Sequence, residues 1–187
     1  MNFTVLDMES EFYKLAMDIL AKPRNFHKLF AVGPESGRLT LMGADGGVVI
    51  GHGVLREMAN GPRKRAYRIG ENIALDLFGG LVEEFDEEVR DLPSKKLMKL
   101  ALGLAHSTGW GEFGLKKMSG GKGKIVIEGR RTIELGMKNP SHHMLTLGYV
   151  AGLCTVAMRK KMTGDVQSVD GKRVVFSFRP ASHGENN

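Results

Sequence analysis

Apolar side chains fill every side of the segment from Asn139 to Lys161, and they are densest between Tyr149 and Ala157. A helix that is apolar all round must be buried on most of its surface. We therefore predict a central helix around which the other elements pack. Gly148, Ala151 and Gly152 give it a shallow face, which suits the close approach of a second backbone.

The ends of this central helix carry recognisable signals. Asn139 is a suitable N-cap, and Pro140 suits the first helical position. Arg159, Lys160 and Lys161 oppose the negative end of the helix dipole. These signals predict a helix that begins near Asn139 and ends near Lys161.

A second long helix is predicted from Tyr67 to Val89. Its apolar side chains recur every four residues at Ile69, Ile73, Leu77, Leu81 and Phe85. Two glycines, Gly79 and Gly80, lie inside it, and each costs on the order of 1 kcal/mol relative to alanine. We expect either a close approach of another group there or a bend in the helix.

Shorter patterns predict three more helices. They are Asp7–Lys22, which Pro23 ends, Val48–Met58, and Lys95–Ser107, which stops at Gly109. The first of these is amphipathic, with apolar residues at three- and four-residue spacing. It packs either on the main domain or against a second subunit, and the pattern favours neither.

Alternating or short apolar runs between turn residues predict the strands. They are Phe26–Val32, Arg38–Met42, Phe113–Met118, Lys124–Glu128, Asp165–Val169 and Arg173–Phe178, with Thr132–Met137 as a third strand after the middle hairpin or its continuation. Gly43–Gly47 is expected to be a loop. Segregated hairpins and helices predict an α+β fold, an antiparallel sheet of about four to five strands packed with helices. The expected organisation is a helix in residues 1–24, one domain in residues 25–180 and a disordered polar tail in residues 181–187.

Composition narrows the function classes. The chain has 27 basic and 21 acidic residues, a net charge of +6, and a single cysteine, Cys154. One cysteine excludes an internal disulfide and a Cys-rich zinc site. Asp7, Glu9 and Glu11 argue against a signal peptide, and no apolar run approaches the ~18 residues of a membrane span. We expect a cytoplasmic protein without a membrane span.

Residues that carry chemistry are not arranged as a catalytic site. His142 and His143 are adjacent at a helix start, so their side chains diverge by roughly 100° and are better explained as surface or helix-terminus residues than as metal ligands. Cys154 has apolar neighbours, where a thiol is inert. We predict no catalytic residue, no metal site and no cofactor, and hence a protein that is not an enzyme.

A basic stretch from Lys116 to Arg131, with Arg63-Lys64-Arg65 upstream, suits contact with phosphates. The aromatic residues that stack on single-stranded bases are not interleaved with it. A solvated hairpin is favoured over a nucleic-acid site, which stays an alternative.

Four motifs occur in a recognisable order: Tyr67–Glu71, Leu104–Gly114 with its Gly-Trp-Gly, Leu147–Gly152 with its Gly-Tyr-Val-Ala-Gly, and Val175–Phe178. Together they resemble the 4-vinyl reductase domain family, a small-molecule or hydrocarbon-binding family related to TRAPP subunits and to haem-nitric-oxide-binding domains. The resemblance implies a sensory or assembly module that binds apolar molecules, often as a dimer. Family cysteines associated with zinc are absent here, where His142 and His143 lie near the first position.

Two hypotheses follow. In the first, an apolar pocket between the two long helices binds a lipid-like or hydrocarbon molecule, and its walls come from Ile73, Leu77, Leu81, Phe85, Leu147, Val150 and Cys154, with Trp110 as a rigid edge. Burial at about 25 cal/mol per Å² is enough to bind an acyl-sized ligand. In the second, the chain is a dimeric scaffold or a basic nucleic-acid-binding regulator. The first is the prediction, with a homodimer expected.

Overall fold

The computed structural model describes residues 30–32, 39–41, 44–47, 52–84, 89, 91–119, 123–134 and 137–182. The predicted helix Asp7–Lys22 and most of the predicted tail lie outside these residues, and so does Phe85. The division into residues 1–24, 25–180 and 181–187 therefore stays a prediction.

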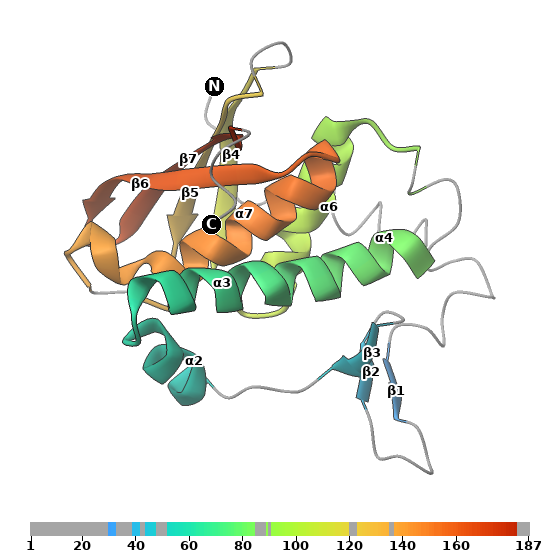
Figure 1. Ribbon diagram of the computed structural model, residues 1–187, viewed down its shortest axis with the longest axis horizontal. Coiled ribbons are helices and arrows are strands. Elements are labelled where there is room, and N and C mark those ends of the chain that lie inside the picture. The colour runs from blue at the N-terminus through green and yellow to red at the C-terminus, as the bar shows by residue number, and fades with distance from the viewer. Residues whose placement is uncertain are drawn as a thin grey trace.

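The described chain contains helices and two sheets (Figure 1). The helical elements are α2 (His52–Ala59), α3 (Arg63–Ala74), the π-helix η2 (Leu75–Gly79), α4 (Gly80–Glu84), α6 (Ser94–Ser107), the 3-10 helix η3 (Pro140–His142) and α7 (Met144–Met158). The strands are β1 (Phe30–Val32), β2 (Leu39–Leu41), β3 (Ala44–Gly47), β4 (Glu112–Met118), β5 (Ile125–Arg130), β6 (Met162–Asp170) and β7 (Arg173–Pro180). This confirms the predicted α+β class.

The main sheet has four strands in the order β4-β5-β7-β6, and every pair is antiparallel. The two predicted hairpins, β4–β5 and β6–β7, are both present. Alternation along the central strands gives the sheet one apolar face. The buried side chains of that face are Phe113, Ile125, Ile127, Val174, Phe176 and Phe178.

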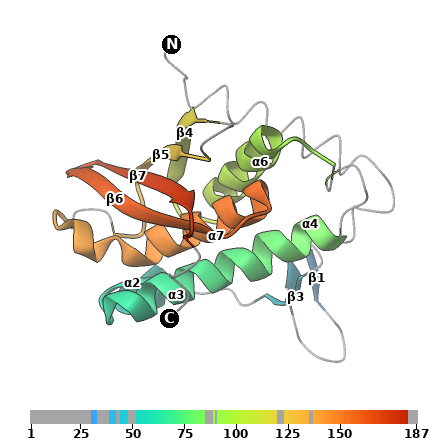
Figure 2. The ribbon, with the colours of Figure 1, turned by 45° about the horizontal axis from the view of Figure 1, so that its top comes forward.

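The molecule is layered around α7. Figures 1 and 2 show α7 between the main sheet on one side and α3 on the other, with α6 beside it. Eleven of its fifteen residues are buried. The prediction of a central, all-round apolar helix is confirmed, because every side of α7 has a packing partner.

The helix signals at the two ends of α7 are used differently from the prediction. The Asn139 side chain accepts a hydrogen bond from the Ser141 amide at 3.0 Å, which caps η3 and not α7. The residue at the N-cap of α7 is His143. At the other end, Arg159 takes a left-handed conformation with φ of 51°, which stops the helix.

Three further element predictions are wrong in part. The Gly43–Gly47 loop contains strand β3, because Ala44 and Gly47 pair with β2 despite their low strand propensity. Thr132–Met137 is not a strand in its described residues, where Ile133 and Glu134 form a turn. The second long helix begins at Arg63, directly after Pro62, and not at Tyr67.

The buried stripe of α3 also differs from the predicted one. Its fully enclosed positions are Ala66, Gly70 and Ala74, continued by Phe78 in η2. The predicted column at Ile69, Ile73 and Leu77 is only half-buried. Hydrophobicity alone selects the larger side chains, whereas the tight seam with α7 requires the small ones.

Candidate functional site

The seam between α3 and α7 is built from glycines. A Cβ on Gly148 would overlap the Tyr67 carbonyl, and one on Gly70 would overlap the Leu145 carbonyl. A Cβ on Gly152 would lie 2.7 Å from the Ala74 Cβ. The helix backbones therefore touch along this half of the seam and leave no room for a ligand there.

Contact loosens further along the same seam. A Cβ placed on Gly79 would meet only the Val156 Cγ2, at 3.9 Å, which is an ordinary van der Waals separation. The glycine contacts therefore exclude the predicted pocket only from the first half of the seam. Its existence stays a prediction.

Trp110 and Tyr149 form an aromatic stack beside that seam, since Tyr149 directly follows the seam glycine Gly148 in α7. Their ring centroids lie 3.7 Å apart and the planes differ by 4°. Trp110 is 5% exposed and Tyr149 is fully buried. Trp110 follows Gly109, which has φ of 82° and turns the chain from α6 toward β4. The stack therefore joins α7 to the connection between α6 and the sheet.

The Tyr149 hydroxyl is the unusual atom of this stack. It is buried and has no hydrogen-bond partner among the residues that the structure describes. Burial raises the pKa of the Tyr149 hydroxyl well above its ordinary value, and the nearby Thr108 hydroxyl acts in the opposite direction without reaching hydrogen-bond geometry. The Thr108 hydroxyl itself donates to the Leu104 carbonyl at 2.8 Å. An enclosed, unpartnered hydroxyl is suited to the polar atom of a bound molecule.

The predicted pocket residues divide into three groups. Leu81, Trp110, Leu147, Val150 and Cys154 are buried in one continuous core. Ile73 and Leu77 pack against that core but stay half-buried, and Phe85 lies outside the described residues. All seven predicted pocket residues that the structure describes therefore lie in or against the same core.

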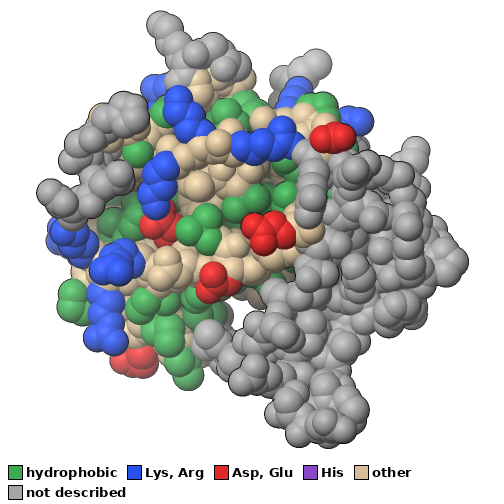
Figure 3. All heavy atoms as spheres, turned by 45° about the vertical axis from the view of Figure 1, so that its right-hand side comes forward, with side chains coloured by type: hydrophobic (Ala, Val, Ile, Leu, Met, Phe, Trp, Pro, Cys, Tyr) green, Lys and Arg blue, Asp and Glu red, His purple; other side chains and the backbone are tan. Residues whose placement is uncertain are grey.

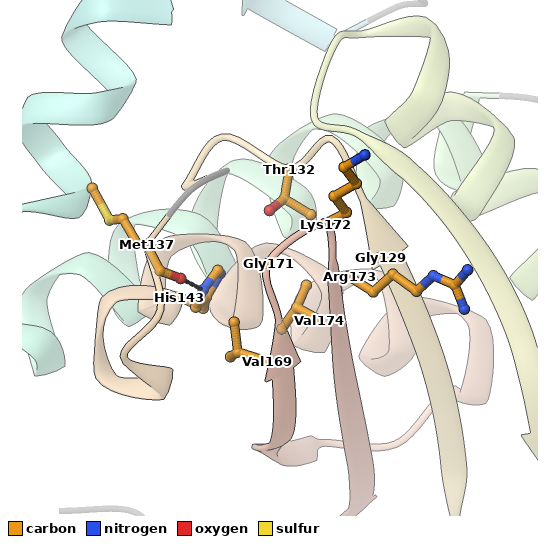
Figure 4. Close-up of a pocket in the computed structure, with 9 residues that line it drawn as sticks. All are labelled: Gly129, Thr132, Met137, His143, Val169, Gly171, Lys172, Arg173 and Val174. Carbon is orange, nitrogen blue, oxygen red and sulfur yellow. Dashed lines mark hydrogen bonds between the residues drawn. The ribbon is translucent and has the colours of Figure 1, made fainter.

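A cavity lies elsewhere, at the N-terminal end of α7 (Figure 4). Its volume of about 10 Å³ is close to that of one water molecule. It is lined by Gly129, Thr132, Met137, His143, Val169, Gly171, Lys172, Arg173 and Val174. None of these is a predicted ligand-binding residue. Figure 4 shows the Arg173 guanidinium directed away from His143, so the lining near the ring is mostly uncharged.

His143 is the main polar group of this cavity. It is 3% exposed, and its Nε2 donates to the Met137 carbonyl at 2.9 Å. Because a carbonyl only accepts, the neutral ring carries its proton on Nε2, and Nδ1 is left as a buried acceptor without a partner in the described part of the chain. His142, by contrast, is exposed. In the described residues no group of three His, Cys, Asp or Glu side chains is placed to hold a metal ion.

Glu134 is a buried acidic residue at the start of α7 that no sequence pattern marks. It is fully buried, and one carboxylate oxygen accepts from the Thr146 amide at 2.9 Å while the other accepts from the Thr146 hydroxyl. The backbone N–H groups of the first turn of a helix have no partner within the helix. A carboxylate that accepts from them stabilises the helix, because its negative charge is favourable at the positive end of the helix dipole. No spacing rule links Glu134 to α7, because the cap is supplied from a neighbouring turn.

The basic hairpin is partly neutralised by two carboxylates. Glu128 pairs with Lys116 at 3.1 Å and with Arg130 at 2.8 Å, and Arg131 pairs with Glu112 at 2.9 Å. Burial alone raises the pKa of Glu128, but the hydrogen bonds from Lys116 and Arg130 bring it below its usual range. Figure 3 shows basic side chains along the left and upper edges of one face of the molecule, with acidic side chains mainly toward its middle. A nucleic-acid site at the hairpin stays the alternative prediction.

Comparison with known proteins gives a result at the level of fold. No family model matches the sequence, and no curated protein matches it. A crystal structure of the phenol-responsive sensory domain of the transcription activator PoxR, with phenol, aligns with a TM-score of 0.66 at 11% identity. The alignment covers 99% of this chain and 94% of that one. The chain therefore shares its overall fold with that domain.

This likeness does not reach the predicted family. At 11% identity it establishes the fold alone, and membership of the 4-vinyl reductase family stays a prediction. Among the described helices, none is long and apolar enough to cross a membrane.

Proposed function

We propose that this chain is a non-enzymatic module that binds a hydrophobic small molecule, lipid-like or hydrocarbon, in a sensory or regulatory role. The observation that carries the proposal is the fully buried, unpartnered Tyr149 hydroxyl stacked beneath Trp110. The shared fold with a phenol-responsive sensory domain supports it.

The energetics of the Tyr149 hydroxyl favour a ligand with one polar atom. A buried hydroxyl without a partner costs about 1–3 kcal/mol, a penalty that a ligand hydrogen bond removes. Apart from the Thr108 hydroxyl, the proposed wall residues are apolar, so burial of the ligand's carbon surface supplies the rest at about 25 cal/mol per Å². Phenol, with which the structurally similar PoxR domain was crystallised, combines an apolar ring with a single hydroxyl in this way.

The proposed ligand walls are the predicted residues Ile73, Leu77, Leu81, Phe85, Trp110, Leu147, Val150 and Cys154, to which Tyr149 is added. Leu147, Val150 and Cys154 share α7 with Tyr149, and Trp110 stacks on it. We further propose that the module is a cytoplasmic homodimer, which the single reduced cysteine and the amphipathic Asp7–Lys22 pattern support.

The test measures binding in the wild type and in Tyr149→Phe. Native mass spectrometry of the purified protein detects any carried molecule, and titration with phenol and with dodecanoic acid supplies two defined probes. Tyr149→Phe should weaken binding by about two- to ten-fold, the value of one neutral hydrogen bond. The ligand-free variant should be as stable as the wild type or more stable, because it loses an unsatisfied group.

Tyr67→Phe is the matched control, because Tyr67 is a half-buried tyrosine on α3 that does not join the Trp110 stack. Its affinity for both probes should equal that of the wild type. A protein that carries no molecule and shows no binding of either probe would remove the proposal. Equal weakening by both variants would remove the role assigned to Tyr149.

A further inference from the structure

The helix from Arg63 to Glu84 is continuous but not uniform. Its middle turn, Leu75–Gly79, is a π-helix, with α3 before it and α4 after it (Figure 1). A π-turn inserts into an α-helix at the cost of regular hydrogen bonding, and such turns recur at bends and at functional sites. The two halves of this helix are also held very differently.

The α3 half is fixed to α7. The carbonyl of Tyr67 lies against Gly148, and Ala74 lies against Gly152. Both contacts are too close to leave room for a side chain at either glycine. The Glu71 carboxylate, 7% exposed, binds the Lys161 ammonium at 2.6 Å and ties α3 to the chain just after α7. Sliding or rotating this half would break backbone packing and an ion pair together.

The half beyond the π-turn lacks such a seam at its start. Gly79 is half-exposed and its hydrogens face Val156 across a separation that would admit a methyl group. Leu75 and Leu77 are half-buried and Asp76 is exposed. Within the π-turn, Phe78 is the one fully buried side chain. It anchors the turn to the core, against which Leu77 and, in α4, Leu81 and Val82 also pack.

We propose that the π-turn Leu75–Gly79 is a hinge, about which α4 swings with Phe78 as its pivot while α3 stays locked on α7. Glycine at position 79 supplies backbone freedom at the hinge, and the space beside Val156 lets the backbone shift without a clash. Few-residue hinges at element ends are an established way of joining a fixed body to a moving one.

The hinge connects the core with the small sheet. Strand β3 contacts both η2 and α4, and Figures 1 and 2 show the small sheet beside α4, away from α7. A swing of α4 therefore moves or releases this sheet, and it widens the seam near Val156. The hinge rests on helix packing alone, so it stands or falls separately from the proposed ligand.

Hydrogen exchange of the ligand-free full chain tests the hinge. Backbone amides from Leu77 to Glu84 should exchange through a common local opening at least about ten-fold more often than those from Ile69 to Ala74, after correction for intrinsic rates. Gly79→Ala fits the space present and favours the helix, so it should slow exchange in η2 and α4 by about two- to five-fold. Exchange in α3 should not change.

Gly53→Ala is the matched control, since Gly53 is also helical and a Cβ there meets nothing within 4 Å. It should leave exchange in η2 and α4 unaltered. Spin labels at Glu83 and Lys160, which are both exposed, give a second readout. With the wild-type sequence at position 79, the distance between the labels should show two populations or one broad distribution. In Gly79→Ala the distribution of that distance should be narrower. Equal protection on both sides of the π-turn, or a single narrow distance in the wild type, overturns the hinge.

Discussion

Single glycine positions decide how closely the two long helices approach each other. At Gly148 the Tyr67 carbonyl occupies the place of a side chain, while at Gly79 the nearest neighbour leaves room for one. The same substitution should therefore have opposite effects at the two sites. Small residues in a sequence mark such a seam only when the position of the partner helix is known.

Gly148→Ala should destabilise the protein by about 1–3 kcal/mol, because a methyl group there forces the α3 and α7 backbones apart. Gly79→Ala should instead raise the free energy of unfolding by about 0.5–1 kcal/mol through helix propensity. Urea unfolding followed by far-UV circular dichroism measures both. A Gly148→Ala protein as stable as the wild type would show that the close contact does not exist in solution.

The thiol of Cys154 gives the protein a pH dependence of known sign. Burial raises the pKa of this thiol in the folded protein. In the unfolded chain a thiol has its ordinary pKa of about 8.5. Above that pH only the unfolded state loses the proton, so ionisation favours unfolding. The stabilising contribution is complete below about pH 8.5 and is lost as the pH rises.

We therefore expect the difference in unfolding free energy between the wild type and Cys154→Ala to be constant up to about pH 8 and then to fall by up to about 1.4 kcal/mol per pH unit. Urea unfolding under reducing conditions measures this difference. The pH is varied from about 7 to about 10, a range that spans the ordinary thiol pKa. Tyr67→Phe serves as control, because a tyrosine in the unfolded chain has its ordinary pKa of about 10 and ionises only at the end of this pH range. A difference that does not change with pH contradicts a buried thiol.

At the scale of single elements, the start of α7 depends on residues outside the helix. Glu134 supplies the carboxylate for the Thr146 amide, and Asn139, which the sequence suggests as the cap, holds only η3. Two candidate caps therefore exist in the chain, and only one acts on the central helix.

Glu134→Ala should lower the free energy of unfolding by about 1.5–3 kcal/mol, the range for hydrogen bonds to charged groups, and should increase amide exchange at the start of α7. Asn139→Ala should lower it by about 1 kcal/mol or less and leave exchange in α7 unchanged. Chemical denaturation and hydrogen exchange distinguish the two. Equal effects from both variants would mean that Glu134 does not cap α7.

Elements with strong local signals were predictable, and those that depend on a partner element were not. The all-round apolar character of α7 and the period-two pattern of β7 follow from local sequence alone. Strand β3 exists because β2 offers hydrogen bonds to a glycine-rich segment, and the buried stripe of α3 uses small residues because α7 approaches there. Neither signal is contained in the residues that form the element.

At the scale of the candidate site, the sequence identified core residues but not their polar chemistry. Trp110 was selected as a rigid edge, yet its stacking on Tyr149 depends on how the α6–β4 connection meets α7. The buried nitrogen of His143 and the buried carboxylate of Glu134 arise from the same cause, since each meets a residue brought close only by folding. Burial of a polar atom is a property of the assembled molecule.

At the scale of the whole molecule, the expected homodimer can be separated from the fold of the single chain. The amphipathic pattern of Asp7–Lys22 needs a partner surface for Met8, Phe12 and Ile19, either on the same chain or on a second one. Removal of residues 1–24 should convert a dimer to a monomer. The buried Trp110–Tyr149 stack should persist, because both residues belong to the described core.

Sedimentation equilibrium measures the mass of the intact and shortened chains, and near-ultraviolet circular dichroism reports the aromatic stack in each. The expected result is a halved mass with an unchanged aromatic spectrum. An intact chain that sediments as a monomer contradicts the homodimer. A shortened chain that stays dimeric moves the interface elsewhere, and a shortened monomer that loses its aromatic spectrum shows that the segment packs on its own domain.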